Sequence, residues 1–211
     1  DDGAQDIEQA RAALERLRDS GVTTLIATPH LDGSLTTRPG ALAERLEQID
    51  VGWRALREMA EIEFPEMKLG RGVELMLNTP TPDLSDERVR LCGGEFLLME
   101  FPYMTVPPQS VQAVSELRMK GWRPVIAHPE RYVGLDAKLE LPGEWRRCGG
   151  HLQVNAGSLV GRYGDEARRV AHELLARGWV DYIASDYHSR GRTAIRSARA
   201  HLGELGGDRI P

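Results

Sequence analysis

Short apolar runs alternate along the chain with longer stretches in which apolar residues recur every three or four positions. In the first long stretch, Ile7, Ala10 and Leu14 fall on one face of a helix. Asp6 can cap the N-terminus of this helix, and Gly21 can end it just before the apolar run 22–27. The pattern therefore predicts a helix, a turn and a strand in that order.

The same reading predicts the remaining elements of the chain. After the strand at residues 22–27, further strands are predicted at residues 68–75, 95–101, 123–128, 151–155 and 180–185. Helices are predicted at residues 39–60, 107–120 and 165–177, and from about residue 192 onward. The Pro-rich segment 77–84 is predicted as a loop, and the charged stretch around Trp145 is assigned no element.

This order of elements predicts the fold class. Strands that alternate with helices favour a mostly parallel sheet covered by helices, either open or closed into a barrel. No GxGxxG motif follows the first strand, so a dinucleotide-binding sheet is not favoured. We expect a TIM-like barrel in one domain, residues 1–211, with the active site at the C-terminal ends of the strands.

Composition narrows the function classes. The 211 residues carry a net charge of -5, which disfavours a dedicated nucleic-acid binder because such proteins need clustered basic residues. No apolar run approaches the roughly 20 residues of a transmembrane helix, so no membrane segment is predicted. Cys92 and Cys148 have no CxxC spacing and predict neither a disulfide framework nor a thiolate zinc site. We expect a cytoplasmic protein.

Six residues that ligate metals in other proteins lie at the predicted C-terminal ends of different strands. They are His30, Glu74, Glu100, His128, Asp186 and His188. In an α/β barrel these strand ends converge on one rim, so residues far apart in sequence would meet there. Imidazoles and carboxylates without thiolates suit manganese, iron or zinc. The set predicts a hydrolytic metal site that can activate water and hold a phosphoryl group.

Each of these residues also has a simpler explanation. A histidine at a strand end is often a hydrogen-bonded structural residue, and Asp186 with His188 could cap the last helix. Glu74 and Glu100 are harder to explain in this way, because each interrupts an apolar strand where an uncompensated carboxylate costs several kcal/mol. A bound cation would offset that cost.

The other basic candidates are distinguished by their positions. Arg131 in the HPER motif and Arg192 in the last predicted helix suit phosphate binding, and Arg190 competes with Arg192 for that role. Three further histidines lie in predicted helices or at the start of a strand and are excluded from the site: His151, His172 and His201.

Several motifs resemble those of a known family. The matching segments are DDGA at residues 1–4, ATPH ending at His30, GVEL around Glu74, LLMEFP around Glu100, IAHPER at residues 126–131, QVNAGSLVG at residues 153–161 and IASDYH at residues 183–188. Together they resemble the PHP (polymerase and histidinol phosphatase) superfamily. HPER and NAGSLVG favour its subgroup of bacterial protein-tyrosine phosphatases from capsular and extracellular polysaccharide loci.

The resemblance implies a distorted barrel of seven strands and helices that holds two to three divalent ions, manganese first, with iron or zinc as alternatives. It implies that Glu74 bridges two ions, that Glu100 and His128 complete one site, and that Asp186 belongs to another. The remaining ion would be held by Asp2, His30 and His188, while Arg131 and Arg192 would bind phosphate. The implied substrate is a phosphotyrosine protein, an autophosphorylating tyrosine kinase of polysaccharide export.

The sequence departs from the family at its start. The family has a strand with an HxH pair just upstream of DDGA, and this chain opens at Asp1 without that strand. Two alternatives to a tyrosine phosphatase stay open. One is a phosphatase for a small metabolite such as histidinol phosphate; the other, motivated by this departure, is a PHP-like domain kept for structure or partner binding. A nuclease of the same superfamily fits poorly with the acidic balance of the chain.

Overall fold

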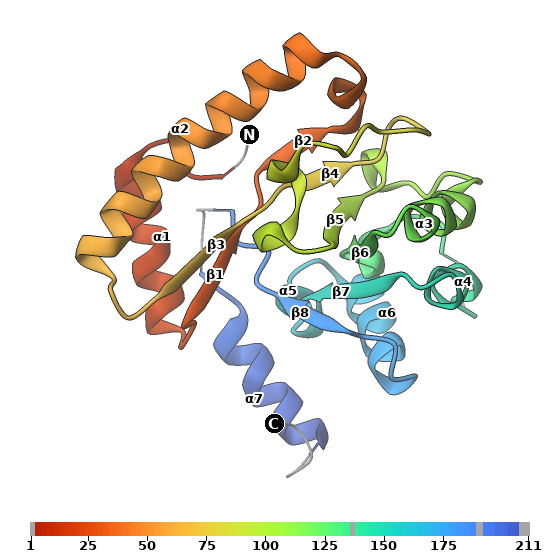
Figure 1. The fold of residues 1–211 in the computed structure, drawn as a ribbon. Helices are drawn as coiled ribbons and strands as arrows, with labels where there is room; N and C mark the ends of the chain where they lie inside the picture. The colour runs from red at the N-terminus through yellow and green to blue at the C-terminus, as the bar shows by residue number, and fades with distance from the viewer. Residues whose placement is uncertain (1–2, 136–137, 189–191, 207–211) are drawn as a thin grey trace.

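The structure is a computed structural model that describes residues 3–135, 138–188 and 192–206 (Figure 1). The strands are β1 Thr24–Ala27, β2 His30–Asp32, β3 Lys68–Arg71, β4 Glu74–Met76, β5 Phe96–Glu100, β6 Arg123–Ala127, β7 His151–Asn155 and β8 Tyr182–Ala184. The α-helices are α1 Ile7–Asp19, α2 Pro39–Glu63, α3 Ser110–Met119, α4 Glu140–Arg147, α5 Ala156–Leu159, α6 Asp165–Ala176 and α7 Ile195–Gly206. Five 3₁₀ turns are present among the described residues: η1 Gly33–Thr37, η2 Glu87–Val89, η3 Leu91–Gly93, η4 Pro102–Met104 and η5 Pro129–Arg131.

The strands form two parallel sheets. β1 pairs with β3, and the larger sheet has the order β2-β4-β5-β6-β7-β8. The prediction of an α/β protein with parallel strands is confirmed. The closed barrel is not found in the part of the chain that the structure describes, where β8 pairs with β7 and β2 with β4. The predicted strand at residues 68–75 is divided into β3 and β4, and a separate strand, β2, follows β1. β1 and β3 pair with each other and, among the described residues, not with β8.

The breaks lie at residues that disrupt a β-ladder. Pro29, which has no backbone N–H, separates β1 from β2. Gly72 lies between β3 and β4 against the loop before β5, where a Cβ atom would approach Leu91 Cδ2 to 2.5 Å. Both strand pairs keep a parallel register on either side of the breaks, with Thr24 opposite Lys68 and His30 opposite Glu74. The breaks therefore lie just before His30 and Glu74, the first residues of β2 and β4.

The longer helices follow the sequence pattern, whereas α4 and the four-residue helix α5 were not predicted. Asp6 caps α1 as predicted, since its side chain accepts the backbone N–H of Gln9 at 2.8 Å. Helix α4 was not predicted, because Pro142 and Gly143 read as helix breakers. Pro142 lies in the first turn of α4, where a proline needs no hydrogen-bonded N–H. None of the described helices has both the length and the apolar composition to cross a bilayer.

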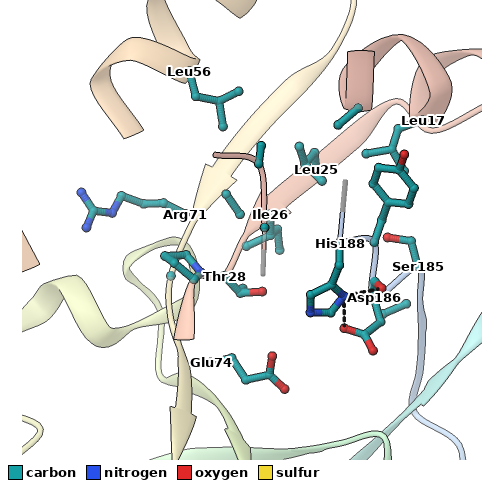
Figure 2. A pocket seen from close by; sticks show the side chains of 18 of the residues that line it. Leu17, Leu25, Ile26, Thr28, Leu56, Arg71, Glu74, Ser185, Asp186 and His188 are labelled. Atoms are coloured by element: carbon teal, nitrogen blue, oxygen red, sulfur yellow. Dashed lines mark hydrogen bonds and ion pairs between the residues drawn. The ribbon is translucent and has the colours of Figure 1, made fainter. Parts of the chain in front are cut away.

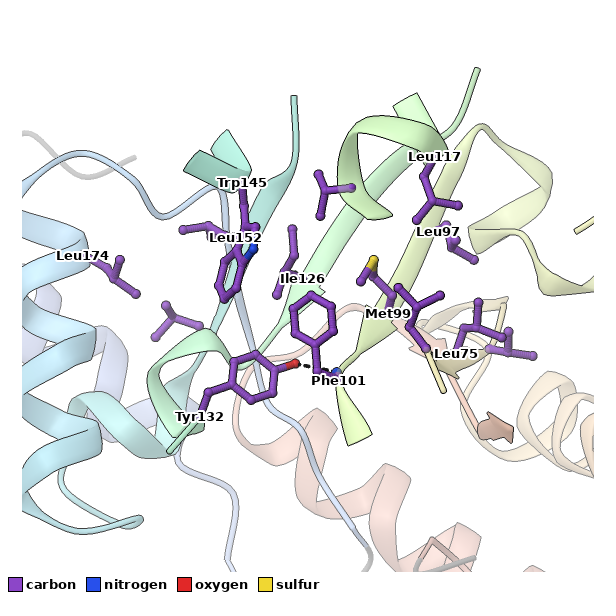
Figure 3. Packing of buried hydrophobic residues seen from close by; sticks show 14 of the residues in the cluster. Leu75, Leu97, Met99, Phe101, Leu117, Ile126, Tyr132, Trp145, Leu152 and Leu174 are labelled. Atoms are coloured by element: carbon purple, nitrogen blue, oxygen red, sulfur yellow. Dashed lines mark hydrogen bonds between the residues drawn. The ribbon is translucent and has the colours of Figure 1, made fainter. Parts of the chain in front are cut away.

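The main core lies between the larger sheet and the helices that cover it (Figure 3). Phe101, Tyr132 and Trp145 form its aromatic centre, with ring centroids 5.5 to 6.3 Å apart. The indole N–H of Trp145 donates to the Ser110 hydroxyl at 3.1 Å. This packing holds the end of β5, where Glu100 lies, and the segment after β6, where His128 lies, against the same core.

Replacing Tyr132 with phenylalanine tests this anchoring. The backbone N–H of Phe101 donates to the buried Tyr132 hydroxyl at 3.0 Å. Tyr132→Phe leaves that donor without a partner and is expected to lower the free energy of unfolding by about 1–3 kcal/mol. Urea unfolding measures the change, and Tyr103→Phe at a tyrosine that is 92% exposed is the matched control. Equal stability of the two variants would contradict the assigned bond.

Candidate metal centre

Parallel strands bring the predicted ligands to one edge of the larger sheet. Glu100 is the last residue of β5, His128 directly follows β6, and Asp186 comes two residues after β8. His30 and Glu74 instead begin β2 and β4, a consequence of the breaks described above, and they lie opposite each other in the ladder. In the neighbouring pair, Glu74 lies opposite Leu98 and Met76 opposite Glu100, so both glutamates project from the same face.

The centre of the site is a group of two carboxylates and an imidazole. One ligand atom from each of Glu74, Glu100 and His128 lies within 4.8 Å of the others. His128 Nε2 is 3.2 Å from Glu74 Oε1 and 3.6 Å from Glu100 Oε2. His30 Nδ1 is 3.6 Å from Glu74 Oε2 and 3.5 Å from Glu100 Oε1. Each carboxylate thus turns one oxygen toward each histidine, an arrangement suited to bridging two cations.

Burial makes this group costly without a positive charge. Glu74 is 5% exposed and His128 is 3% exposed. Burial acts to lower the pKa of His128, but the hydrogen bond and the charge of Glu74 outweigh it, and the pKa of the imidazole is raised. The Glu74 carboxylate thus favours a positive charge at this position. Carboxylate oxygens with imidazole nitrogens, and no thiolate, fit a first-row divalent ion.

A second group of side chains lies beside the first. Asp186 Oδ2 accepts hydrogen bonds from Arg131 Nη1 at 2.9 Å and from Asn155 Nδ2 at 2.6 Å. His188 Nδ1 lies 3.6 Å from Asp186 Oδ1, and the His188 ring stacks on that of His30 with centroids 6.0 Å apart. Figure 2 shows Glu74, Asp186 and His188 directed toward the same part of the cavity. The structure therefore brings all six predicted strand-end residues into one region.

The backbone is strained at two of these residues. His128 has φ +36° and Asp186 has φ +45°, in the left-handed region that non-glycine residues rarely occupy. The surrounding packing and hydrogen bonds must offset the cost of each conformation, on the order of 1–3 kcal/mol. Strained residues of this kind cluster at active sites, so the strain at His128 and Asp186 agrees with a functional role for both residues.

The ligands line a cavity of about 1250 Å³. Four of the predicted residues lie on its wall: His30, Glu74, Asp186 and His188. The rest of the wall includes apolar side chains of α1, β1 and β8, among them Leu14, Ile26 and Ile183. The cavity therefore lies beside one side of the cluster.

The predicted arginines differ in their placement. The Arg131 guanidinium lies over the Tyr163 ring, 4.4 Å from its centroid, in addition to its bond with Asp186. Arg192 is exposed just before α7. Asp2 and Arg190 lie outside the described residues.

The three excluded histidines lie elsewhere. His151 pairs with Asp181 at the start of β7, the opposite end of the strand from the cluster. His172 of α6 and His201 of α7 contact each other, with their Nε2 atoms 3.2 Å apart. Their positions agree with their exclusion from the site.

Two buried polar residues beside the cluster, Glu130 and Asn155, were not predicted from the sequence. Glu130 is 3% exposed and Asn155 is fully buried. Both lie in segments singled out for their motifs, HPER and QVNAGSLVG, but the motifs alone assign neither residue a role. Position in the sequence could have identified Asn155, because it is the last residue of a strand that ends at the same rim as the candidate ligands.

Comparisons with known proteins identify a family and several relatives of this chain. The family described as capsular polysaccharide synthesis, CpsB/CapC, matches residues 1–202. The chain is 30% identical to the tyrosine-protein phosphatase YwqE of Bacillus subtilis over 195 residues, which cover 90% of this chain and 73% of YwqE. It is 27% identical to the tyrosine-protein phosphatase CpsB of Streptococcus pneumoniae over 196 residues, which cover 90% of this chain and 78% of CpsB.

The fold is also similar to a solved structure. A chain from a study of YwqE of Bacillus subtilis and CpsB of Streptococcus pneumoniae, described as unique metal-dependent tyrosine phosphatases, matches with a TM-score of 0.76. The two chains are 29% identical, and the match covers 98% of this chain and 83% of the other. With a family match that runs from its first residue into α7, this chain belongs to the CpsB/CapC family of capsular polysaccharide synthesis.

Proposed function

We propose that this protein is a metal-dependent protein-tyrosine phosphatase. The observation that carries the proposal is the buried group of Glu74, Glu100 and His128 at the rim of the sheet, within 4.8 Å of one another. Membership of the CpsB/CapC family and the similarity to tyrosine phosphatases support the same activity. We also propose that the chain forms one domain, residues 1–211, of the PHP type.

The proposed site holds two to three divalent ions. Glu74, Glu100 and His128 would hold the first, and the oxygens that Glu74 and Glu100 turn toward His30 would help to hold a second. Asp186, His188 and, by resemblance, Asp2 would complete the set. Manganese is the expected metal. Such ions supply Lewis-acid activation of the attacking water and of the phosphoryl group.

The protein's own residues bind and orient the phosphate. Arg131 presents a planar guanidinium that can donate two parallel hydrogen bonds to phosphoryl oxygens. Its contact with the Tyr163 ring and its bond to Asp186 hold it beside the cluster. Arg192, exposed before α7, is the second proposed phosphate ligand. In the reaction, water attacks phosphorus and gives up a proton, the bond from phosphorus to the phenolic oxygen breaks, and the leaving phenolate takes up a proton. The products are inorganic phosphate and the tyrosine side chain.

The proposed substrate is a phosphotyrosine protein, specifically an autophosphorylating tyrosine kinase of polysaccharide synthesis. We propose that the two proteins meet in the cytoplasm.

We further propose that the parallel strands belong to a distorted barrel. In the described part of the chain β1 pairs with β3 and β8 pairs with β7, and residues of both β1 and β8 line the same cavity. One further parallel strand between them would join the two sheets.

The activity is tested by assaying a phosphotyrosine peptide and histidinol phosphate in parallel, with protein stripped of metal and then supplied with Mn²⁺. We expect hydrolysis of the peptide that depends on Mn²⁺ and exceeds hydrolysis of histidinol phosphate by at least about tenfold in kcat/KM. Faster turnover of histidinol phosphate would favour a metabolite phosphatase. Metal-loaded protein that hydrolyses neither compound would overturn the proposal.

A further inference from the structure

Asn155 contacts one of the proposed ligands directly. Its side-chain Nδ2 donates to Asp186 Oδ2 at 2.6 Å, and the residue has no exposed surface. The opposite orientation of the amide would place its Oδ1 against a carboxylate oxygen, which is repulsive, so the chemistry fixes the donor toward Asp186. Asn155 Oδ1 is buried and has no hydrogen-bond partner among the described residues. The side-chain amide of Asn155 therefore makes its hydrogen bond to Asp186.

Glu130 holds Asn155 in place. Glu130 Oε1 accepts the backbone N–H of Asn155 at 3.0 Å and the hydroxyl of Ser158 at 2.6 Å. These bonds tie the turn after β6 to the junction of β7 and α5. All three side chains are at most 3% exposed. The end of β7 is therefore fixed in position, and with it the direction of the Asn155 side chain.

The two oxygens of Asp186 are used differently. Oδ2 accepts both the Asn155 amide and the Arg131 guanidinium, at 2.6 and 2.9 Å. Oδ1 instead faces His188, whose Nδ1 is 3.6 Å away. Two donors on one oxygen leave the other oxygen to coordinate a cation. The backbone of Asp186 is also strained, with φ +45°, so contacts with other residues must hold it in this conformation.

We infer that Asn155 is a positioning residue, which orients Asp186 so that Oδ1 is presented to a divalent ion, and that Glu130 anchors Asn155. Polar groups that hold a ligating carboxylate typically change metal affinity by about 10- to 100-fold when removed. The inference rests on the proposed function, because it takes Asp186 as a metal ligand. It assigns a role to a residue that does not itself touch metal or substrate.

The test measures metal affinity rather than turnover. Metal-stripped wild type and Asn155→Ala would be titrated with Mn²⁺ by calorimetry, and the unfolding midpoint of each metal-free protein would be recorded. Ser110→Ala is the matched control, since Ser110 is 1% exposed and accepts one hydrogen bond, from Trp145 on the helix side of the sheet. Asn155→Ser, which keeps a small polar group at the position, serves if the alanine variant does not fold.

We expect Mn²⁺ affinity to fall about 10- to 100-fold in the Asn155 variant and to stay at the wild-type value in Ser110→Ala, although both lose stability. Wild-type Mn²⁺ affinity in the folded Asn155 variant would overturn the inference. That result, with wild-type protein still hydrolysing phosphotyrosine peptide, leaves the proposed function standing. If the Asn155 variant binds Mn²⁺ more weakly but the wild-type protein does not hydrolyse the phosphotyrosine peptide, the proposed function is wrong and the positioning role stands.

Discussion

Glu74→Gln is expected to remove bound metal and to lower kcat/KM on a phosphotyrosine peptide by about 10²- to 10³-fold. Glu74 Oε1 faces His128 and Oε2 faces His30, so its carboxylate serves two positions at once. Glutamine keeps the shape but replaces one of these oxygens with an NH₂ group, which repels a cation. It also removes one of the negative charges that would hold the ions.

The measurement combines elemental analysis of the purified variant with steady-state kinetics. Glu95→Gln is the control, because Glu95 is exposed just before the start of β5, at the opposite edge of the sheet from Glu100. This control should keep wild-type metal content and activity. A Glu74→Gln protein with full metal content and full turnover would exclude Glu74 from the site.

Arg131→Lys is expected to lower kcat/KM by about 10²-fold while leaving the fold intact. Lysine keeps the charge but loses the planar fork that donates two hydrogen bonds to phosphate. It also loses the geometry of the bond to Asp186 and the stacking on Tyr163. The loss should appear in the kinetics of the phosphotyrosine peptide, and the free energy of unfolding should change by less than about 1 kcal/mol.

A matched control is available on the same sheet. Arg123 lies over the Phe96 ring, 4.4 Å from its centroid, the same separation as between Arg131 and Tyr163. Arg123 begins β6, so it lies at the far end of the strand from His128. Arg123→Lys should therefore have wild-type activity. If both lysine variants lose activity equally, the loss reports on stacking in general and Arg131 has no special role in phosphate binding.

The class of fold was predictable because its elements are locally encoded. The recurring apolar positions of α1, its Asp6 cap and the strand at β5 follow from side-chain type and spacing alone. The breaks between β1 and β2 and between β3 and β4 depend on tertiary context: the approach of the loop before β5 to Gly72 is not visible in a linear pattern. Helix α4 was missed because Pro142 is tolerated only at the position in the helix that it occupies.

The candidate site was predictable in its chemistry and not in its geometry. Glu74 and Glu100 interrupt apolar strands, and this pattern alone marks them as unusual in the sequence. That each glutamate turns one oxygen to His30 and the other to His128 depends on strand register, which the sequence does not reveal. Asn155 looks like an ordinary strand end until its amide is found 2.6 Å from Asp186 Oδ2.

The most direct test of the metal centre is anomalous diffraction from crystals of the protein soaked in Mn²⁺ and recorded at the manganese edge. We predict an anomalous peak within about 2.5 Å of an oxygen of Glu74, an oxygen of Glu100 and Nε2 of His128. A fully soaked crystal with no anomalous peak among these three side chains would contradict the assignment of a metal site there.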